Sequence, residues 1–213
     1  MVLAKNTAEH VAAYLRMAIL RGEIKSKEPL RQDKIAEELG LSKIPIREAL
    51  VQLKAEGLVT LHLNRGAYVS TLNAAEAAEI YTIRIALETV ALESAIPHHT
   101  PAQLMEAENT LRVMDVETDV ARWVELNWQF HAQLYQAAQM PRLISILEPL
   151  HINVARYLVL YLNNLGYQAA SQGEHYAILQ ACRAGNVTEA VQVLRQHLQS
   201  ASTTLTTFLM SEM

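Results

Sequence analysis

The spacing of apolar residues predicts three helices in the first third of this chain. Apolar positions recur at helical intervals over residues 7–20, where Thr7 is a suitable N-cap, and again over 32–39. Gly40 then supplies the left-handed conformation that glycine adopts at low cost at the end of a helix. Ser42 is suited to cap a third helix, whose core face consists of Ile46, Ala49, Leu50 and Leu53.

After these helices the residue pattern becomes that of a β-hairpin. Residues 58–61 and 67–71 are short β-rich runs, and the turn between them contains Asn64, Arg65 and Gly66. Short helices joined by a glycine turn and followed by a hairpin are typical of a winged helix-turn-helix, which binds double-stranded DNA. We therefore predict a DNA-binding domain over residues 1–72.

The third helix carries the cations that this interpretation requires. Lys43 and Arg47 share the side opposite the core, where a recognition helix would meet the major groove. Arg47 is the better candidate for a guanine because its guanidinium can bond two acceptors at once, whereas Lys43 acts as a point charge. The same two residues could instead form an ordinary solvated face. The other candidate DNA contacts are Arg31 and Ser42, expected on phosphates, and Arg65 and Gly66, expected at the wing tip.

The remaining two-thirds of the chain shows only helical patterns. Residues 73–213 contain no β-rich run and no glycine-rich phosphate loop, and breaks fall at Pro97, Pro141, Gly166 and the Gly185-Asn186 turn. We predict a mostly α protein, with an all-α bundle of six to seven helices as its second domain. The predicted helices cover 74–95, 101–115, 120–138, 143–163, 168–184 and 187–208.

Charge differs between the two predicted domains. Residues 1–72 hold six Lys and five Arg against eight acids, a net +3, whereas residues 73–213 hold seven Arg against fourteen acids, a net −7. Only the first domain is therefore suited to meet a polyanion. The single cysteine excludes an internal disulfide, and no stretch approaches the ~20 apolar residues that span a bilayer. We expect a cytoplasmic protein with no membrane partner, associated with the nucleoid when it is bound to DNA.

Three histidines fall on stripes that the helical pattern assigns to the core of the bundle. His131 shares its stripe with Asn127, and His175 and His197 lie among aliphatic residues of two later helices. A lone histidine of this kind is more often a hydrogen-bonded core residue than a ligand. Three that converge on one interior suggest a transition-metal site, because each neutral imidazole would otherwise need its own buried partner.

Several of these segments resemble a known family. A resemblance to the DNA-binding domain of the GntR family of bacterial transcription regulators covers residues 7–71, in GEIKSKEPLRQDKIAEELGLSKIPIREALVQLKAEGLV and NRGAYV. SKIPIREAL stands where that family often has S-R-T-P-V-R-E-A-L, so Lys43 replaces a common arginine. NWQFHAQL, EHYAIL and RQHL resemble the FCD ligand-binding domain over residues 75–210, which is typical of the FadR subfamily.

The resemblance implies a metal site and a dimer. Many members of the subfamily bind a divalent metal through an acidic residue and three histidines, matched here by Asn127, His131, His175 and His197. The metal would be Zn²⁺ or an ion with similar preferences, such as Ni²⁺ or Mn²⁺. Asn127 removes the anionic ligand, so the affinity for the metal should fall, although an amide oxygen can still coordinate. The family also implies a homodimer on an inverted-repeat DNA operator.

The charge of such a site indicates the class of effector. Four neutral ligands leave a bound divalent ion uncompensated, which favours a small carboxylate effector. Arg84 is a candidate clamp for it, in agreement with the family resemblance, unless it forms a helix–helix or surface ion pair. Arg156 and Tyr157 are weaker candidates, and His151 and Trp128 are interpreted as packing residues.

Together these features predict a ligand-responsive transcriptional regulator that acts as a repressor, and not an enzyme. Two alternatives stay open at this point. The bundle could bind a larger ligand such as an acyl-thioester without any metal, with the histidines as polar lining. Alternatively, three histidines around an open metal position could activate water for hydrolysis, but a hydrolase would have no need of a DNA-binding domain.

Overall fold

A computed structural model of the chain describes the backbone of residues 2–63, 65–165 and 168–211, and the side chains of 7–63, 65–155, 157–159 and 168–211. The chain divides into two compact units. One consists of the residues up to Leu72 together with Ile152–Arg156, and the other of Asn73–His151 and the residues from Tyr157 onward. Each unit is described by itself.

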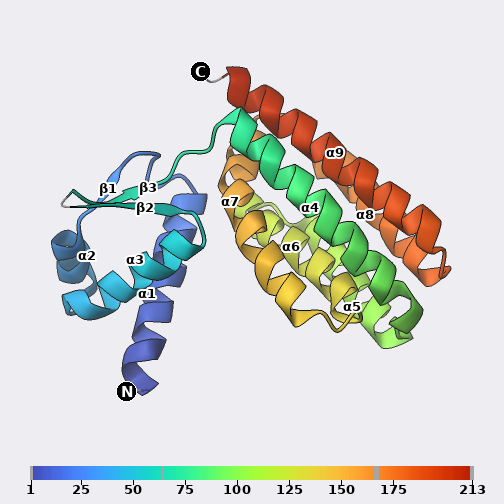
Figure 1. Ribbon diagram of the computed structural model, residues 1–213, viewed down its shortest axis with the longest axis horizontal. Helices are drawn as coiled ribbons and strands as arrows, with labels where there is room; N and C mark the ends of the chain where they lie inside the picture. Colours follow the sequence, from blue (N-terminus) through green and yellow to red (C-terminus); the bar gives the residue numbers. More distant parts are fainter. Residues whose placement is uncertain (1, 64, 166–167, 212–213) are drawn as a thin grey trace. The chain divides into compact units, whose positions relative to one another are not determined.

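The first unit contains three helices and a small antiparallel sheet (Figure 1). Its strands lie in the order β1-β3-β2, and β2 pairs with β3 as a hairpin in which Val59 lies opposite Val69. This is the winged helix-turn-helix that the sequence predicts. Its elements are α1 (Val2–Leu20), β1 (Pro29–Leu30), α2 (Gln32–Leu39), α3 (Lys43–Ala55), β2 (Val59–His62) and β3 (Gly66–Val69).

Two local features differ from the prediction. Helix α1 begins at Val2, so Thr7 lies inside the helix and does not cap it. Residues 29–30, for which the sequence pattern predicts no strand, form the short strand β1, in which Pro29 lies opposite Tyr68 and Leu30 opposite Ala67. Leu30 is buried in the core of this unit, and the extended backbone places its side chain there.

The helix-turn-helix forms where the local signals indicate. Gly40 has a φ of 64° at the C-cap of α2, the left-handed conformation expected of it. Ser42 occupies the N-cap position of α3 with an extended backbone, but its side chain makes no capping hydrogen bond. The predicted core face of α3 is buried together with residues of α1, which packs against it. The position of α3 is therefore determined by its apolar face.

The second unit is an all-helical bundle in the part that the structure describes. Two capping boxes fix helix starts, one between Asn73 and Glu76 and the other between Thr100 and Gln103. The predicted breaks at Pro97, Pro141 and the Gly185-Asn186 turn fall at or beside observed helix ends, and Gly166 lies outside the described residues. Its helices are α4 (Ala74–Ala95), the 3₁₀ turn η1 (Ile96–His98), α5 (Pro101–Val116), α6 (Val120–Gln136), α7 (Pro141–Leu165), α8 (Gln168–Arg183) and α9 (Val187–Ser211).

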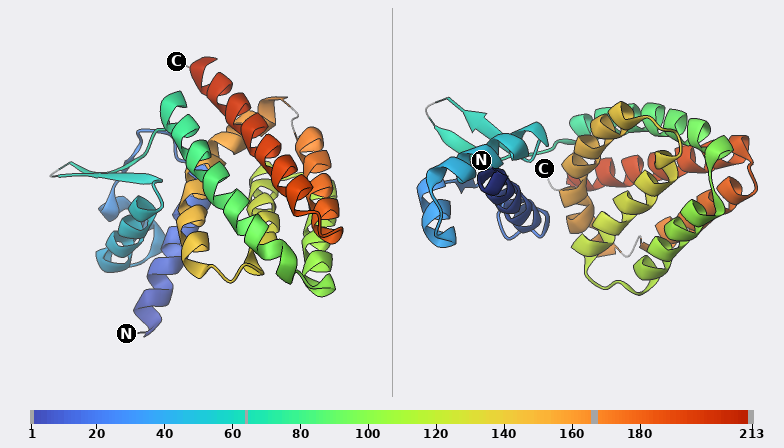
Figure 2. Two further views of the ribbon diagram at one scale, coloured as in Figure 1. Left: turned by 45° about the vertical axis from the view of Figure 1, so that its right-hand side comes forward. Right: turned by 90° about the horizontal axis from the view of Figure 1, so that it is seen from below.

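Helices of this bundle surround a common interior. Helix α4 packs along α9 and also contacts α6, while α5 packs against α6 and α8, and α8 packs against α9. Figure 2 shows these helices from two further directions, with α4 and α9 side by side in the left view. The mostly α fold class is confirmed. Within the described residues, no helix has both the length and the apolar character needed to cross a membrane.

We expect Leu53→Ala to destabilise the first unit by about 2–5 kcal/mol, because Leu53 is fully buried and its truncation leaves a cavity. The measurement is urea unfolding followed by circular dichroism. Val51→Ala is the matched control, since Val51 lies on the same helix but is 53% exposed. Equal losses for the two variants would contradict the assignment of the core face.

Candidate functional site

All six candidate DNA-contacting residues are exposed in the first unit. Arg47 lies on the outer face of α3, and the described residues provide no ion pair or hydrogen-bond partner for its guanidinium. Ser42 precedes the same helix, and Arg31 is the N-cap residue of α2. The cationic side of the helix-turn-helix is therefore open to a polyanion, as the sequence predicts.

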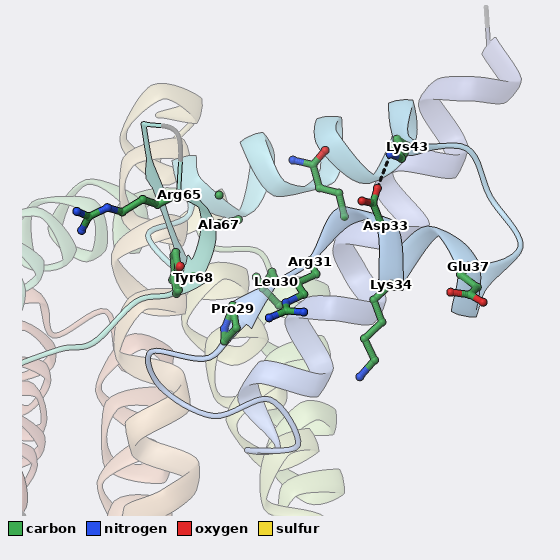
Figure 3. Close-up of a pocket in the computed structure, with 12 residues that line it drawn as sticks. Pro29, Leu30, Arg31, Asp33, Lys34, Glu37, Lys43, Arg65, Ala67 and Tyr68 are labelled. Carbon is green, nitrogen blue, oxygen red and sulfur yellow. Dashed lines mark ion pairs between the residues drawn. The ribbon is translucent and has the colours of Figure 1, made fainter.

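Lys43 differs from Arg47 because an acidic neighbour pairs with it. Its ammonium forms an ion pair with Asp33 of α2, drawn as a dashed line in Figure 3. Both side chains are more than 60% exposed, so the pair is weak and can exchange for a phosphate. The two residues border an open groove of about 810 Å³, which Arg31 and Arg65 also line.

The wing supplies the remaining candidates. Arg65 extends from the hairpin in Figure 3, and Gly66 has a φ of 89°, a conformation that favours glycine. Asn64, the third residue of the predicted hairpin tip, lies outside the described residues. Both described residues of the tip are exposed, which leaves the backbone of the wing accessible to DNA.

The bundle brings the three predicted histidines together from three helices. His131 on α6, His175 on α8 and His197 on α9 each offer one ring nitrogen, and these atoms lie within 4.8 Å of one another. All three side chains are buried. The ring centroids are separated by 5.2 Å for His131 and His175, and by 4.7 Å for His175 and His197.

Each of these imidazoles has a hydrogen-bond partner at Nδ1. His131 Nδ1 lies 3.2 Å from the Tyr135 hydroxyl, and His197 Nδ1 lies 2.8 Å from a carboxylate oxygen of Glu174. His175 Nδ1 lies 3.2 Å from the amide oxygen of Gln172. Carboxylate and amide oxygens only accept, so the last two imidazoles carry a proton on Nδ1, and the neutral form of each has its lone pair on Nε2.

The Nε2 atoms of His131 and His175 are buried and make no hydrogen bond within the described residues. Unpartnered buried polar atoms are rare in folded proteins, and outer partners that orient the other ring nitrogen are typical of histidines that ligate a metal. Burial lowers the pKa of His131 and of His175 well below the ordinary value, with neighbouring histidines as a further cause. Both imidazoles are therefore neutral, and their residue types and lone pairs fit a divalent transition metal.

A small cavity connects this cluster to two other predicted residues. Arg84, Asn127 and His197 all line it, and the space open to a water-sized molecule is about 30 Å³. Trp123 lines the cavity and also a wider cleft of about 470 Å³, which has Asp115 on its rim. The cavity therefore holds the amide, the guanidinium and an imidazole near one another, beside a cleft with an acidic rim.

Arg84 is buried and forms an ion pair within α4. Its Nε donates to a carboxylate oxygen of Glu88 at 2.7 Å, and the other carboxylate oxygen of Glu88 accepts from the Tyr135 hydroxyl at 2.6 Å. Burial opposes the charge on Arg84, but Glu88 together with Tyr81 and Tyr135 outweighs it, so the pKa of Arg84 lies above its ordinary value. Burial and the neighbouring Glu88 raise the pKa of Tyr135 well above its ordinary value.

The weaker candidates lie elsewhere. Tyr157 is buried but is not among the residues that line the cavity, whereas the adjacent Leu158 is. The side chain of Arg156 lies outside the described residues. His151 stacks on Trp128 with a centroid separation of 5.0 Å, in keeping with a packing role.

Three partner residues escaped the sequence-based reasoning. Glu88 lies four residues after Arg84, Tyr135 four residues after His131, and Gln172 three residues before His175. Residues at these separations are neighbours on a helix surface. Helical spacing could therefore have identified them once the histidines were recognised.

A winged helix-turn-helix with an exposed cationic face, followed by a helical domain with an internal cavity that Arg84, Asn127 and His197 help to line, is the architecture of a transcriptional regulator. Residues 7–69 match the model of bacterial regulatory proteins of the gntR family, and residues 79–200 match the FCD domain. The chain belongs to the GntR family and carries an FCD domain. It is a regulator that binds DNA and not an enzyme.

Relatives and a solved structure agree with this assignment. The HTH-type transcriptional regulator YdhC of Bacillus subtilis (strain 168) is 29% identical over 203 residues, 92% of this chain and 90% of the relative. The HTH-type transcriptional repressor RspR of Escherichia coli (strain K12) is 24% identical over 197 residues, 91% of this chain and 86% of the relative. The crystal structure of a GntR-family regulator from Pseudomonas syringae pv. tomato str. DC3000 is 32% identical, with a TM-score of 0.62 and coverage of 97% of this chain and 87% of that one.

The depressed pKa values of His131 and His175 predict how stability depends on pH. As pH falls through the ordinary value of 6.5, the unfolded chain takes up protons before the folded one, so this contribution is present above about pH 6.5 and is lost toward acid. The midpoint temperature of thermal unfolding of the metal-free protein should decrease as the pH is lowered from about 7 to about 5. His175→Gln should make this dependence shallower, and an equally steep fall in that variant would argue against the neutral cluster.

Proposed function

We propose that this protein is a repressor that binds an inverted-repeat operator as a homodimer and responds to a small organic acid. The printed name of RspR, a transcriptional repressor, supports the repressive action. Two-fold symmetry of a dimer would present two copies of α3 to successive major grooves. The exposed position of Arg47 supports its role as the principal base contact, with Lys43 and Arg65 on the DNA backbone.

The observation that carries the second half of the proposal is the convergence of three buried imidazoles with two unpartnered Nε2 atoms. His131, His175 and His197 would hold a divalent transition metal, with the amide oxygen of Asn127 as a further ligand. A bound metal supplies positive charge and open coordination positions. Glu174 and Gln172 keep the protons of two histidines on Nδ1 and so prepare their Nε2 atoms as ligands.

Charge within the cavity supports a carboxylate as the effector. All four proposed ligands are neutral groups, and Arg84 and Glu88 compensate one another, so a divalent ion would leave the interior with excess positive charge. An anion that reaches both the metal and Arg84 removes this excess. The small cavity favours an effector of a few heavy atoms over an acyl-thioester, which would require the helices to move apart.

Coupling to DNA follows from linkage between two states of the dimer. An effector bound in the bundle weakens DNA binding only if it favours the dimer geometry in which the two copies of α3 are wrongly spaced. The size of the response equals the difference in effector affinity between the two geometries. The effector therefore need not contact the DNA-binding unit.

Arg47→Ala should reduce affinity for specific DNA at least about tenfold, because a bidentate guanine contact contributes about 1–3 kcal/mol on each half-site. A gel shift with the full chain and the intergenic DNA that flanks its gene measures this effect. Lys54→Ala is the control, since it removes the same charge from the last turn of the same helix. Equal losses of DNA affinity for both variants would show that Arg47 contributes only its charge and makes no base-specific contact.

The double variant His175→Ala/His197→Ala should lose bound metal while retaining DNA affinity, because it removes two ligands from the second unit only. Elemental analysis of protein purified without a histidine tag, then loaded with Zn²⁺ and dialysed, measures the metal content. His10→Ala/His98→Ala is the control, since both histidines are exposed. Stoichiometric metal in the cluster variant would exclude the proposed site.

A further inference from the structure

A chain of hydrogen bonds joins the proposed effector clamp to one of the proposed metal ligands. It runs from Arg84 Nε to Glu88 over 2.7 Å, from Glu88 to the Tyr135 hydroxyl over 2.6 Å, and from that hydroxyl to His131 Nδ1 over 3.2 Å. Each of these four residues is at most 2% exposed. Water therefore does not compete for these bonds, and their direction is determined by the groups themselves.

The position of each proton in the chain follows from donor and acceptor capacity. The carboxylate of Glu88 accepts twice, once from Arg84 and once from Tyr135. A phenol has one proton, so the oxygen of Tyr135 has only lone pairs left for His131. His131 must then donate from Nδ1, which leaves the lone pair of the neutral ring on Nε2, an atom with no hydrogen-bond partner among the described residues.

We propose that Glu88 and Tyr135 are positioning residues that couple Arg84 to the metal ligand His131, an inference that rests on the proposed function. They hold His131 in the tautomer that can ligate a metal. They also transmit the state of Arg84, because each hydrogen bond in a buried chain polarises the next. In this series of hydrogen bonds a tyrosine stands between the carboxylate and the histidine, whereas Glu174 contacts His197 directly.

The sign of this coupling follows from charge. An anionic effector paired with Arg84 draws the guanidinium away from Glu88, whose carboxylate then accepts more strongly from Tyr135. The Tyr135 oxygen becomes a better acceptor for the Nδ1 proton of His131, and Nε2 becomes a better electron donor to the metal. Effector and metal therefore favour one another's binding through this chain, in addition to their direct attraction, and the effect is reciprocal.

The first test is Tyr135→Phe in the full chain, which removes the hydroxyl and keeps the ring. Histidine ¹⁵N NMR of the metal-free protein should show His131 protonated on Nδ1 in the parent and a loss of that preference in the variant. Competition with a chromophoric chelator should show a 10- to 100-fold lower affinity for Zn²⁺. Thr110→Val is the matched control, since it removes a buried hydroxyl that bonds to Gln133 on the same helix as His131 but lies outside this chain.

A double-mutant cycle tests the coupling to Arg84. Arg84→Lys keeps the charge but loses the Nε–H donor, and it should change the affinity for Zn²⁺ when Tyr135 is present. In the Tyr135→Phe background the same substitution should change this affinity about half as much or not at all. Glu88→Gln provides a second break in the chain and should also weaken Zn²⁺ binding. Circular dichroism and thermal unfolding of each variant establish that the protein is folded.

The outcomes separate this inference from the proposed function. An unchanged His131 tautomer and Zn²⁺ affinity within twofold of the parent in Tyr135→Phe would overturn the positioning role. Strictly additive effects in the cycle would overturn the coupling. Failure of the parent chain to bind Zn²⁺ would instead overturn the metal site, and the NMR measurement on the metal-free protein would still decide whether Tyr135 sets the tautomer of His131.

Discussion

The burial of ionisable groups inside an apolar bundle is the constraint on which the structure of the second unit depends. Removing Arg84 or Glu88 alone from water costs several kcal/mol, which only close pairing can offset. The structure meets this requirement by pairing Arg84 with Glu88 one helical turn later, and the Tyr135 hydroxyl donates to the second carboxylate oxygen of Glu88. Within the described part of the interior, the histidine nitrogens that stay unpaired are therefore the exception, and two of them face a common point.

The DNA-binding unit handles charge in the opposite way. Its candidate DNA-contacting cations are exposed, and the pair between Lys43 and Asp33 is weak, because these side chains must exchange water for phosphate and base edges at little cost. Its stability comes instead from an apolar core in which the inner faces of α1, α2 and α3 meet the sheet. One chain thus combines an exposed basic surface suited to a polyanion with a buried interior whose charged groups compensate one another.

Two substitutions relative to the family pattern separate this chain from a generic member. Lys43 stands where an arginine is common, and its ammonium is paired with Asp33. The guanidinium of Arg47 is therefore more available for base recognition than the ammonium of Lys43. Asn127 stands where an acid is common, and it lines the cavity together with Arg84. With a neutral amide at that position, the charge of a bound metal would have to be balanced by another group, and the anionic effector that we propose would supply that charge.

Local pattern by itself determined which residues face inward and, apart from the start of α1, approximately where the helices begin and end, because helical spacing and caps act over a few residues. It predicted that His131, His175 and His197 are buried. Glu88 and Tyr135 each lie one helical turn after a residue that they contact, so the same helical spacing could have identified them as its partners. It did not predict β1, because two residues carry no pattern and the strand exists only where β3 can pair with it. Only the tertiary structure decided which inward-facing residues meet, since the rotation and alignment of helices across the bundle depend on the packing of all their side chains together.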